Sequence, residues 1–174
     1  LDRLGLELVL PAQVGIDVQV AETGDTYTEN ALIKARTLAE VSGMPALADD
    51  SGLEVDALDE APGVRSARFR LGSDEVRYRA LLRALKGVPE AERTARFRCI
   101  AALVLPDGRS YTTEGVCEGV ITTEPAGEEG FGYDPVFYVP SRDKTMAELS
   151  PEVKNQISHR ARAAQKMRPI LGSL

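Results

Sequence analysis

Near the start of the chain, the order of apolar and polar residues predicts two short strands followed by a helix. Residues 5–9 and 16–20 alternate or cluster apolar side chains as strands do, so we expect the chain to open inside a sheet. Thr26 and Glu29 have the spacing of a capping box, in which each side chain satisfies a backbone N–H at a helix start. The helix is expected to run to about Ser42. Its expected inner positions are Ala31, Leu32, Ala35, Leu38 and Ala39.

Further along, the pattern predicts a second helix and a long hairpin. Residues 73–86 form an amphipathic segment with a capping serine at its start. Residues 96–105 and 109–123 are β-prone runs on either side of a Pro-Asp-Gly turn, and a glycine-rich loop over 124–134 and a short strand over 136–139 follow. The elements indicate a mixed sheet flanked by helices. The expected inner positions of the second helix are Val76, Ala80, Leu81, Ala84 and Leu85.

Length and composition favour one compact domain. The chain has 174 residues and a hydrophobic content of 43%, enough for a sizeable core. No apolar run reaches the roughly 18 residues that a membrane-spanning helix needs. Residues 1–10 lack the basic start and the long apolar core of a signal peptide. We therefore expect a cytoplasmic protein.

Charge, histidine and cysteine content narrow the chemistry. The net charge of −6 and the pI near 5.0 argue against non-specific nucleic-acid binding, which needs a basic surface, but leave a small anionic substrate possible. Because His159 is the single histidine, a multi-histidine metal site is excluded and any metal should be bound through oxygen. Cys99 and Cys117 lack the spacing of a zinc site or a redox pair, and we expect buried thiols.

Asp49-Asp50-Ser51-Gly52 is the first candidate site. Acidic residues and a glycine interrupt a strand-like segment here, which would put an acid at a strand end, where open α/β sheets bind their ligands. The same residues are common in turns, so the motif alone favours a turn and a site equally. Because adjacent side chains of an extended segment face opposite sides, we expect only one of the two aspartates to face a given site.

Glu29 has an ordinary structural explanation, since a glutamate at a helix start serves the capping box and interacts favourably with the helix dipole. If the fold brings Glu29 near Asp50, the two carboxylates would form a hard-oxygen site suited to Mg²⁺. This ion takes one or two carboxylates and completes its shell with water and substrate phosphates.

The segment 127–135 places Phe131 and Tyr133 among glycines, followed by Asp134. An aromatic side chain on a loop can stack on a nucleobase, and glycine lets the backbone approach a ligand closely. The structural alternative is that both aromatic rings fill the adjacent core. This alternative is favoured when the segment is considered alone.

Lys154, His159 and Arg160 form the last candidate group. Positions five apart lie about 140° apart around a straight helix, so Lys154 and His159 diverge unless the helix breaks. Ser150-Pro151 predicts the start of the helical region, and Ser158 would cap a second helix whose N-terminal N–H groups could face an anion. The alternative is a continuous surface helix with solvated basic side chains.

Together these segments resemble the inosine triphosphate pyrophosphatase family, the house-cleaning non-canonical purine NTP pyrophosphatases. The resemblance covers nearly the whole chain, and the joint pattern is far more specific than any one motif. The matching motifs, in order, are Glu22-Thr23-Gly24-Asp25-Thr26, Glu29-Asn30-Ala31, Ala48-Asp49-Asp50-Ser51-Gly52-Leu53, Ala61-Pro62-Gly63-Val64-Arg65-Ser66-Ala67-Arg68-Phe69, Gly130-Phe131-Gly132-Tyr133-Asp134-Pro135 and Ile157-Ser158-His159-Arg160.

The resemblance implies an α/β fold, with one two-lobed domain over 1–174, a long curved mixed β-sheet flanked by helices, and a substrate cleft between the lobes. It implies a Mg²⁺-dependent hydrolase, usually a homodimer, that converts dITP/ITP and XTP/dXTP to the monophosphate and pyrophosphate. By matching motif, Asp50 would be the catalytic residue and a metal ligand, Glu29 a further metal ligand, and Ser51 a substrate contact. The implied nucleotide-binding residues are Phe131, which would stack on the purine, Gly132, Tyr133, Asp134, Lys154, His159 and Arg160.

The family also begins with a strand and a Thr/Ser-Gly-Asn-x-x-Lys loop that grips phosphates, and no such motif occurs in this sequence. We therefore expect the domain over 1–174 to lack this N-terminal strand-loop. Three alternatives stay open: a nucleotide-binding homologue or sensor without hydrolysis, a Mg²⁺-dependent phosphatase that releases orthophosphate, and a purely structural domain.

Overall fold

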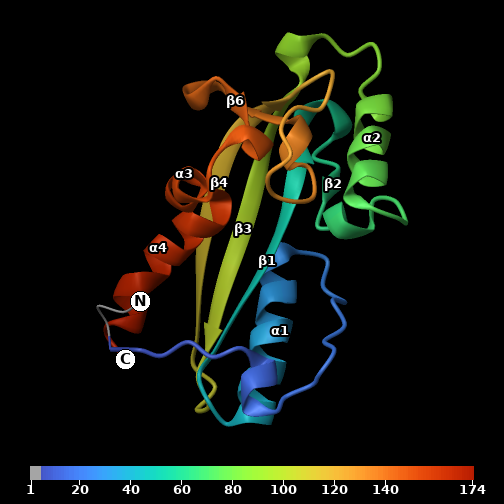
Figure 1. Ribbon diagram of the computed structural model, residues 1–174. Coiled ribbons are helices and arrows are strands. Elements are labelled where there is room, and N and C mark those ends of the chain that lie inside the picture. The colour runs from blue at the N-terminus through green and yellow to red at the C-terminus, as the bar shows by residue number, and fades with distance from the viewer. Residues whose placement is uncertain (1–4) are drawn as a thin grey trace.

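The computed structural model describes residues 5–174, and a six-stranded sheet with helices on both faces is its centre (Figure 1). The strand order is β2-β1-β3-β4-β5-β6. The strands are β1 Ala46–Val55, β2 Pro62–Gly63, β3 Thr94–Val104, β4 Ser110–Ile121, β5 Phe137–Val139 and β6 Lys144–Thr145. The helices are α1 Tyr27–Ser42, α2 Asp74–Ala84, α3 Pro151–Ile157 and α4 His159–Leu171. The α/β class and the long β3–β4 hairpin are confirmed.

The sheet is antiparallel at every pairing within residues 5–174, whereas a mixed sheet was expected. The physical reason lies in the connections. Parallel neighbours need a long crossover, usually a helix, while antiparallel neighbours need only a turn or loop. The steps from β3 to β4, β4 to β5 and β5 to β6 contain no α-helix.

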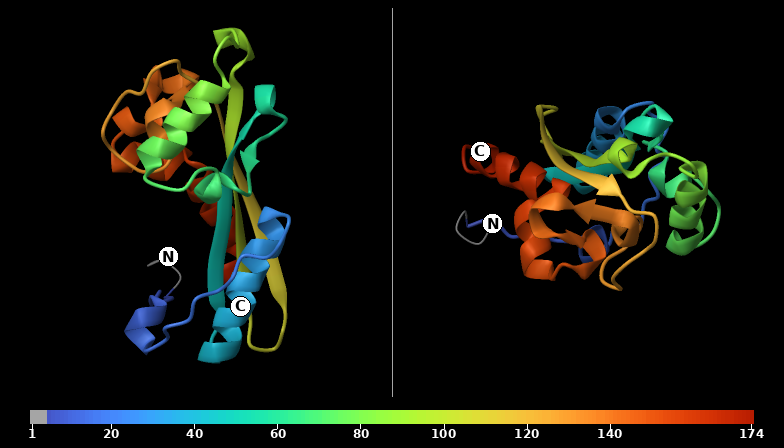
Figure 2. Two further views of the ribbon diagram at one scale, coloured as in Figure 1. Left: turned by 90° about the vertical axis from the view of Figure 1, so that its right-hand side faces the viewer. Right: turned by 90° about the horizontal axis from the view of Figure 1, so that it is seen from above.

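Alternating side chains of β3 build two separate cores. Ile100, Ala102 and Val104 pack with α1, whereas the odd-numbered neighbours Cys99, Ala101 and Leu103 pack with α4. Because successive strand residues face opposite sides of a sheet, α1 and α4 cover opposite faces. Figure 2 shows the two helices on either side of the long strands. At the other end of the hairpin, a third core lies with α2 and β5, giving the molecule its two-lobed form in Figure 1.

The first helix follows its sequence signals closely. Thr26 Oγ1 accepts a hydrogen bond from the Glu29 N–H at 3.2 Å, and Glu29 closes the capping box. Gly43 ends α1 with a φ of 65°, a conformation that glycine adopts without strain. Small residues line the inner side of α1, so the helix approaches the sheet closely. Its buried alanines are Ala31, Ala35 and Ala39.

The buried side of the second helix differs slightly from the expected one. Ala80, Leu81 and Leu85 are buried as predicted, but Val76 and Ala84 are exposed, so these two inner positions were wrong. Val76 lies about 140° from Leu81 around the helix, and Ala84 is the last helical residue.

The strands expected over 5–9 and 16–20 are absent from the structure. Residues Pro11–Val14 form a 3-10 helix, and the flanking apolar residues are largely exposed. An apolar run becomes a strand only where another strand satisfies its backbone N–H and C=O groups. Neither run is paired with a strand of the described chain, so the expectation that the chain opens inside a sheet was wrong.

Strand β1 is continuous through the acidic motif, so the expected interruption and strand end were also wrong. Asp50 pairs with Ile100 and Gly52 with Arg98 of β3, and this ladder overrides the turn tendency of the motif. Gly52 has a packing reason, because a Cβ there would meet the Gly63 carbonyl oxygen at 2.2 Å. The remaining edge of β1 from 46 to 52 has no ladder partner among residues 5–174.

Two further expectations concern thiols and membranes. Cys99 and Cys117 are free and buried, as predicted. None of the helices formed by residues 5–174 is long and apolar enough to cross a membrane.

Candidate functional site

Asp49 and Asp50 point to opposite faces of β1, which confirms the expectation from strand geometry. Asp50 is only 8% exposed and faces α1, where its Oδ1 accepts a hydrogen bond from Lys34 Nζ at 3.0 Å. Its Oδ2 accepts from Asn30 Nδ2 at 3.3 Å. Asp49 faces α4, and its Oδ2 accepts from Arg160 Nε at 3.0 Å. The acidic pair therefore serves two different groups of side chains.

Lys34 joins two carboxylates on the α1 face. Its Nζ lies 2.8 Å from Glu22 Oε1 and 3.0 Å from Asp50 Oδ1, so one ammonium group lies between both acids. Burial raises the pKa of Asp50, and the hydrogen bond and charge of Lys34 oppose this rise. Burial alone would lower the pKa of Lys34, but its hydrogen bonds to Glu22 and Asp50 raise it. We call Glu22, Asn30, Lys34 and Asp50 the α1-face cluster.

No hydrogen bond or ion pair joins the Glu29 side chain to this cluster. Its Oε2 accepts hydrogen bonds from the backbone N–H groups of Asp25 at 2.8 Å and Thr26 at 3.0 Å, and these bonds lower the pKa of Glu29. The capping role is thus present, while the metal role of Glu29 stays a prediction. Glu22 is the carboxylate that shares a cation with Asp50.

The α1-face cluster fits a hard cation that is completed by a substrate. Its two carboxylates already share the positive charge of Lys34, and oxygen is the ligand atom that Mg²⁺ prefers. Within residues 5–174, no group of three or more His, Cys, Asp or Glu side chains could hold a metal alone. Mg²⁺ needs only one or two protein carboxylates, because it fills its shell with water and phosphates.

A second group lies on the α4 face around Arg160. The Arg160 guanidinium lies 5.3 Å from the centroid of the Phe131 ring, and Phe131 is 62% exposed. Tyr133 is 4% exposed, and its hydroxyl donates to the Ser66 carbonyl oxygen at 2.8 Å. The core-filling alternative therefore holds for Tyr133 but not for Phe131, which is largely exposed beside the Arg160 guanidinium.

Asp134 and Lys154 complete this group. We call Asp49, Phe131, Asp134, Lys154 and Arg160 the α4-face cluster. Lys154 Nζ lies 3.0 Å from Asp134 Oδ2 and 3.3 Å from the Glu129 carbonyl oxygen. Burial raises the pKa of Asp134, while the hydrogen bond and charge of Lys154 oppose the rise.

The loop backbone beside this cluster is fixed from α2. The Gly132 N–H donates to Asp74 Oδ2 at 2.6 Å, and Gly132 has a φ of 62°, in the left-handed region. The loop that carries Phe131 is therefore tied to the first turn of α2.

The predicted break after α3 is confirmed. Ser158 is extended, with φ −65° and ψ 155°, and its Oγ accepts from the Ala161 N–H at 3.2 Å as the cap of α4. His159 follows at the helix start but turns inward, where its ring stacks on Phe97 with centroids 4.9 Å apart. Burial and the neighbouring Arg160 lower the pKa of His159 to about 4, so the ring is neutral at pH 7. The Lys154 ammonium contacts Asp134 and the Glu129 carbonyl oxygen, and no hydrogen bond joins it to His159.

The imidazole of His159 also has an unused hydrogen-bonding atom. Among the residues that the structure describes, its buried Nδ1 has no hydrogen-bond partner. A buried polar atom without a partner costs free energy, so this atom is a candidate contact for a ligand at the start of α4.

The two clusters lie on opposite faces of the same strand, at its unpaired edge. Ser51 is half-buried and shares the α4 side of β1 with Asp49. A ligand that crosses this edge could contact both clusters, with anionic groups at Lys34 and an aromatic ring at Phe131. The arrangement supports a hydrolysis reaction in which a carboxylate acts on the attacking water.

Sequence reasoning gave no individual role to four residues of the site. Glu22 and Asn30 were named only within the matching motifs, Asp49 only within the acidic motif, and Lys34 was not named. A signal was present for Asn30 and Lys34. Asn30 and Lys34 are four apart on α1, so both lie on the same side of the helix as the buried alanines, where polar residues are unusual.

Comparison with known proteins agrees with this fold and motif order. Residues 2–170 match the model of the Ham1 family. The dITP/XTP pyrophosphatase of Desulforamulus reducens is 55% identical over 90% of this chain and 79% of its own length. That of Bacillus subtilis is 44% identical over 98% of this chain and 87% of its own length.

Solved structures give the same relationship. The Ham1 protein of Staphylococcus aureus superimposes with a TM-score of 0.85 and 42% identity, over 94% of this chain and 84% of that one. A HAM1 protein from Coxiella burnetii gives a TM-score of 0.84 and 45% identity, over 90% of this chain and 82% of that one. This chain belongs to the Ham1 family.

Proposed function

We propose that this protein hydrolyses non-canonical purine nucleoside triphosphates, of the dITP/ITP and XTP/dXTP type, to the monophosphate and pyrophosphate. The observation that carries the proposal is that Glu22 and Asp50 share Lys34 on one side of the unpaired edge of β1. Phe131 and Arg160 lie on the other side of this edge. Relatives at 44% and 55% identity that are dITP/XTP pyrophosphatases support it.

On the α1 face, the cluster would bind the triphosphate. Asp50 and Glu22 would hold Mg²⁺, which supplies charge neutralisation and polarisation of phosphoryl oxygens when bound. Lys34 would contact a phosphate oxygen while it keeps its hydrogen bonds to the two carboxylates. The pair of Glu22 and Asp50 replaces the pair of Glu29 and Asp50 as our preferred metal-binding set.

Asp50 would orient a water molecule for attack on the α-phosphorus and accept its proton, and pyrophosphate would leave. The raised pKa of Asp50 suits this role, because a more basic carboxylate accepts a proton more readily at neutral pH. Asn30 would hold the other carboxylate oxygen through its amide group.

On the α4 face, the cluster would bind the base. Phe131 would stack on the purine, and Arg160 and Lys154 would donate hydrogen bonds toward a 6-oxo group. Adenine presents a 6-amino group instead, which would leave those donors unpaired and lower its binding. Neutral His159 and Ser51 would line the same face.

The proposal also includes the oligomeric state, the cellular location and the partners. We propose a homodimer, which the family resemblance implies, and a cytoplasmic location. The net charge of −6 supports the absence of a nucleic-acid partner.

The test is product identification with and without Mg²⁺. The protein and its Asp50→Asn variant are incubated with ITP, XTP, GTP and ATP, and both products are identified. We expect monophosphate and pyrophosphate, mainly from ITP or XTP, only with Mg²⁺, and almost none from the variant. Orthophosphate as the direct product, or nucleotide binding without hydrolysis, would contradict the proposal.

A further inference from the structure

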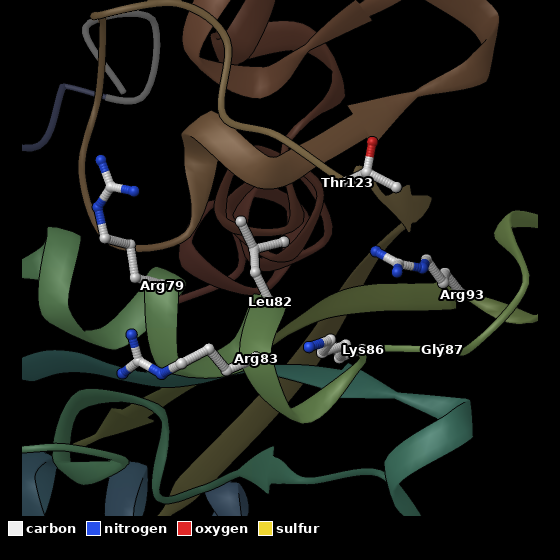
Figure 3. A pocket seen from close by; sticks show the side chains of 7 residues that line it. All are labelled: Arg79, Leu82, Arg83, Lys86, Gly87, Arg93 and Thr123. Atoms are coloured by element: carbon white, nitrogen blue, oxygen red, sulfur yellow. The ribbon is translucent and has the colours of Figure 1, made fainter.

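A basic pocket lies at the C-terminal end of α2, away from the site described above. Its volume is about 360 Å³, and its lining includes the cationic residues Arg79, Arg83, Lys86 and Arg93 (Figure 3). No carboxylate lines it, although the whole chain carries a net charge of −6. We call it the basic pocket. It falls within the range of about 300 to 1,000 Å³ that small-molecule sites occupy.

Arg93 provides a fixed positive charge at the pocket wall. Arg93 is only 6% exposed. Its three guanidinium nitrogens donate to the carbonyl oxygens of Val88, Thr122 and Leu85, each at 3.0 Å. A guanidinium has five N–H donors, so two remain for another acceptor. Within residues 5–174 no carboxylate neutralises this charge.

The other cations form a stripe along one side of α2 and the residues after it. Arg79 and Arg83 are four apart on α2, which places them on one helix face, and Lys86 follows two residues after the last helical residue, Ala84. Arg79 pairs with Glu75, whereas Arg83 and Lys86 make no ion pair with any described residue. Like charges four apart destabilise a helix slightly, so an anionic ligand would relieve the repulsion between Arg79 and Arg83.

We propose that the basic pocket binds a small oligophosphate anion such as inorganic pyrophosphate. Arg83, Lys86 and the free donors of Arg93 would contact the phosphate oxygens. Leu82 and Thr123 complete the wall and offer no aromatic surface for a base, so the charge of the ligand is the recognised feature.

This pocket is distinct from the nucleotide site. The loop of that site is hydrogen-bonded to the first turn of α2, where Asp74 accepts from Gly132, whereas the pocket is built mainly from the last turn of α2 and the residues after it. Along α2, Asp74 and Arg83 lie nine residues apart, a rise of about 13 Å. Anion binding at the basic pocket therefore does not depend on nucleotide hydrolysis at the other site.

Binding is tested by titrating the ¹⁵N-labelled full chain with inorganic pyrophosphate without Mg²⁺. We expect saturable shifts of the amide signals of Lys86, Gly87 and Arg93. The exposed pair is replaced in Arg83→Ala/Lys86→Ala, since loss of buried Arg93 risks the fold. This variant should bind at the pocket at least about tenfold more weakly, because two charge-assisted contacts are lost.

The matched control is Lys166→Ala/Arg168→Ala, which removes the same charge from exposed positions near the end of α4. It should bind pyrophosphate at the basic pocket as the unmodified protein does, and both variants should keep their nucleotide hydrolysis. Equal weakening by the two double variants would indicate general charge attraction and overturn the proposal. The absence of saturable shifts at the three amides would overturn it as well.

Discussion

Asp49 and Asp50 are neighbours in the chain, yet each accepts a hydrogen bond at 3.0 Å from a basic residue on a different face of the sheet. Asp50 binds Lys34 of α1, and Asp49 binds Arg160 of α4. Two adjacent residues of β1 thus each hold one basic side chain of a different cluster. This relationship explains how one strand edge could organise both the phosphate end and the base end of a nucleotide.

Replacement of Lys34 by Met should move the acidic limb of the activity profile to higher pH. Asp50 acts as a carboxylate, and the hydrogen bond and charge of Lys34 lower its pKa against the effect of burial. Without Lys34, burial is unopposed and the pKa of Asp50 rises further, so activity is lost earlier as pH falls. The measurement is kcat/KM against pH, with Lys166→Met as a surface control. An unmoved acidic limb would rule out this coupling.

The two candidate metal carboxylates can be separated by a pair of variants. Glu22→Gln should raise the Mg²⁺ concentration for half-maximal activity at least about tenfold, because it removes a charged ligand. Glu29→Gln should leave this concentration unchanged and lower the thermal stability modestly, since it weakens the cap of α1. The reverse pattern would restore Glu29 as the ligand and remove Glu22.

Arg160→Ala should weaken the preference for 6-oxo purines over adenine while the fold stays intact. Loss of one charged donor lowers discrimination by about tenfold to a hundredfold. The measurement is the ratio of kcat/KM for ITP to that for ATP, with exposed Arg168→Ala as the control. An unchanged ratio would remove Arg160 from base recognition.

Local signals in the sequence predicted the element boundaries well. The capping box of Thr26, the turn residues before Arg109 and the cap at Ser158 act within three or four residues, and each is where it was expected. The apolar runs before residue 20 failed because a strand also needs a partner, which no local pattern provides.

The site depended on contacts that the sequence does not reveal. The bond from Arg160 to Asp49 spans 111 positions and follows from the packing of α4 on the sheet. Strand alternation predicted that only one aspartate faces each group, but not which helix meets which aspartate. Glu29 was expected as a metal ligand because its helix position and motif were recognisable, whereas the link from Glu22 to Asp50 through Lys34 follows no local pattern.

The stability of the fold should fall in mild acid because of His159. Its pKa is lowered to about 4 in the folded protein, against an ordinary value near 6.5, so the unfolded chain binds the proton more tightly. The free energy of unfolding should therefore decrease as pH falls from about 6.5 to 4, by about 3 kcal/mol in total. Denaturant unfolding at several pH values measures this change. His159→Gln should lack this part of the decrease, and an identical pH dependence in both proteins would contradict the buried neutral ring.

The position of water attack tests the central claim most directly. ITP is hydrolysed with Mg²⁺ in ¹⁸O-labelled water, and both products are analysed by mass spectrometry. Attack on the α-phosphorus beside Asp50 predicts one labelled oxygen in the monophosphate and unlabelled pyrophosphate. Label in pyrophosphate or in orthophosphate would show attack at another phosphorus and contradict the account.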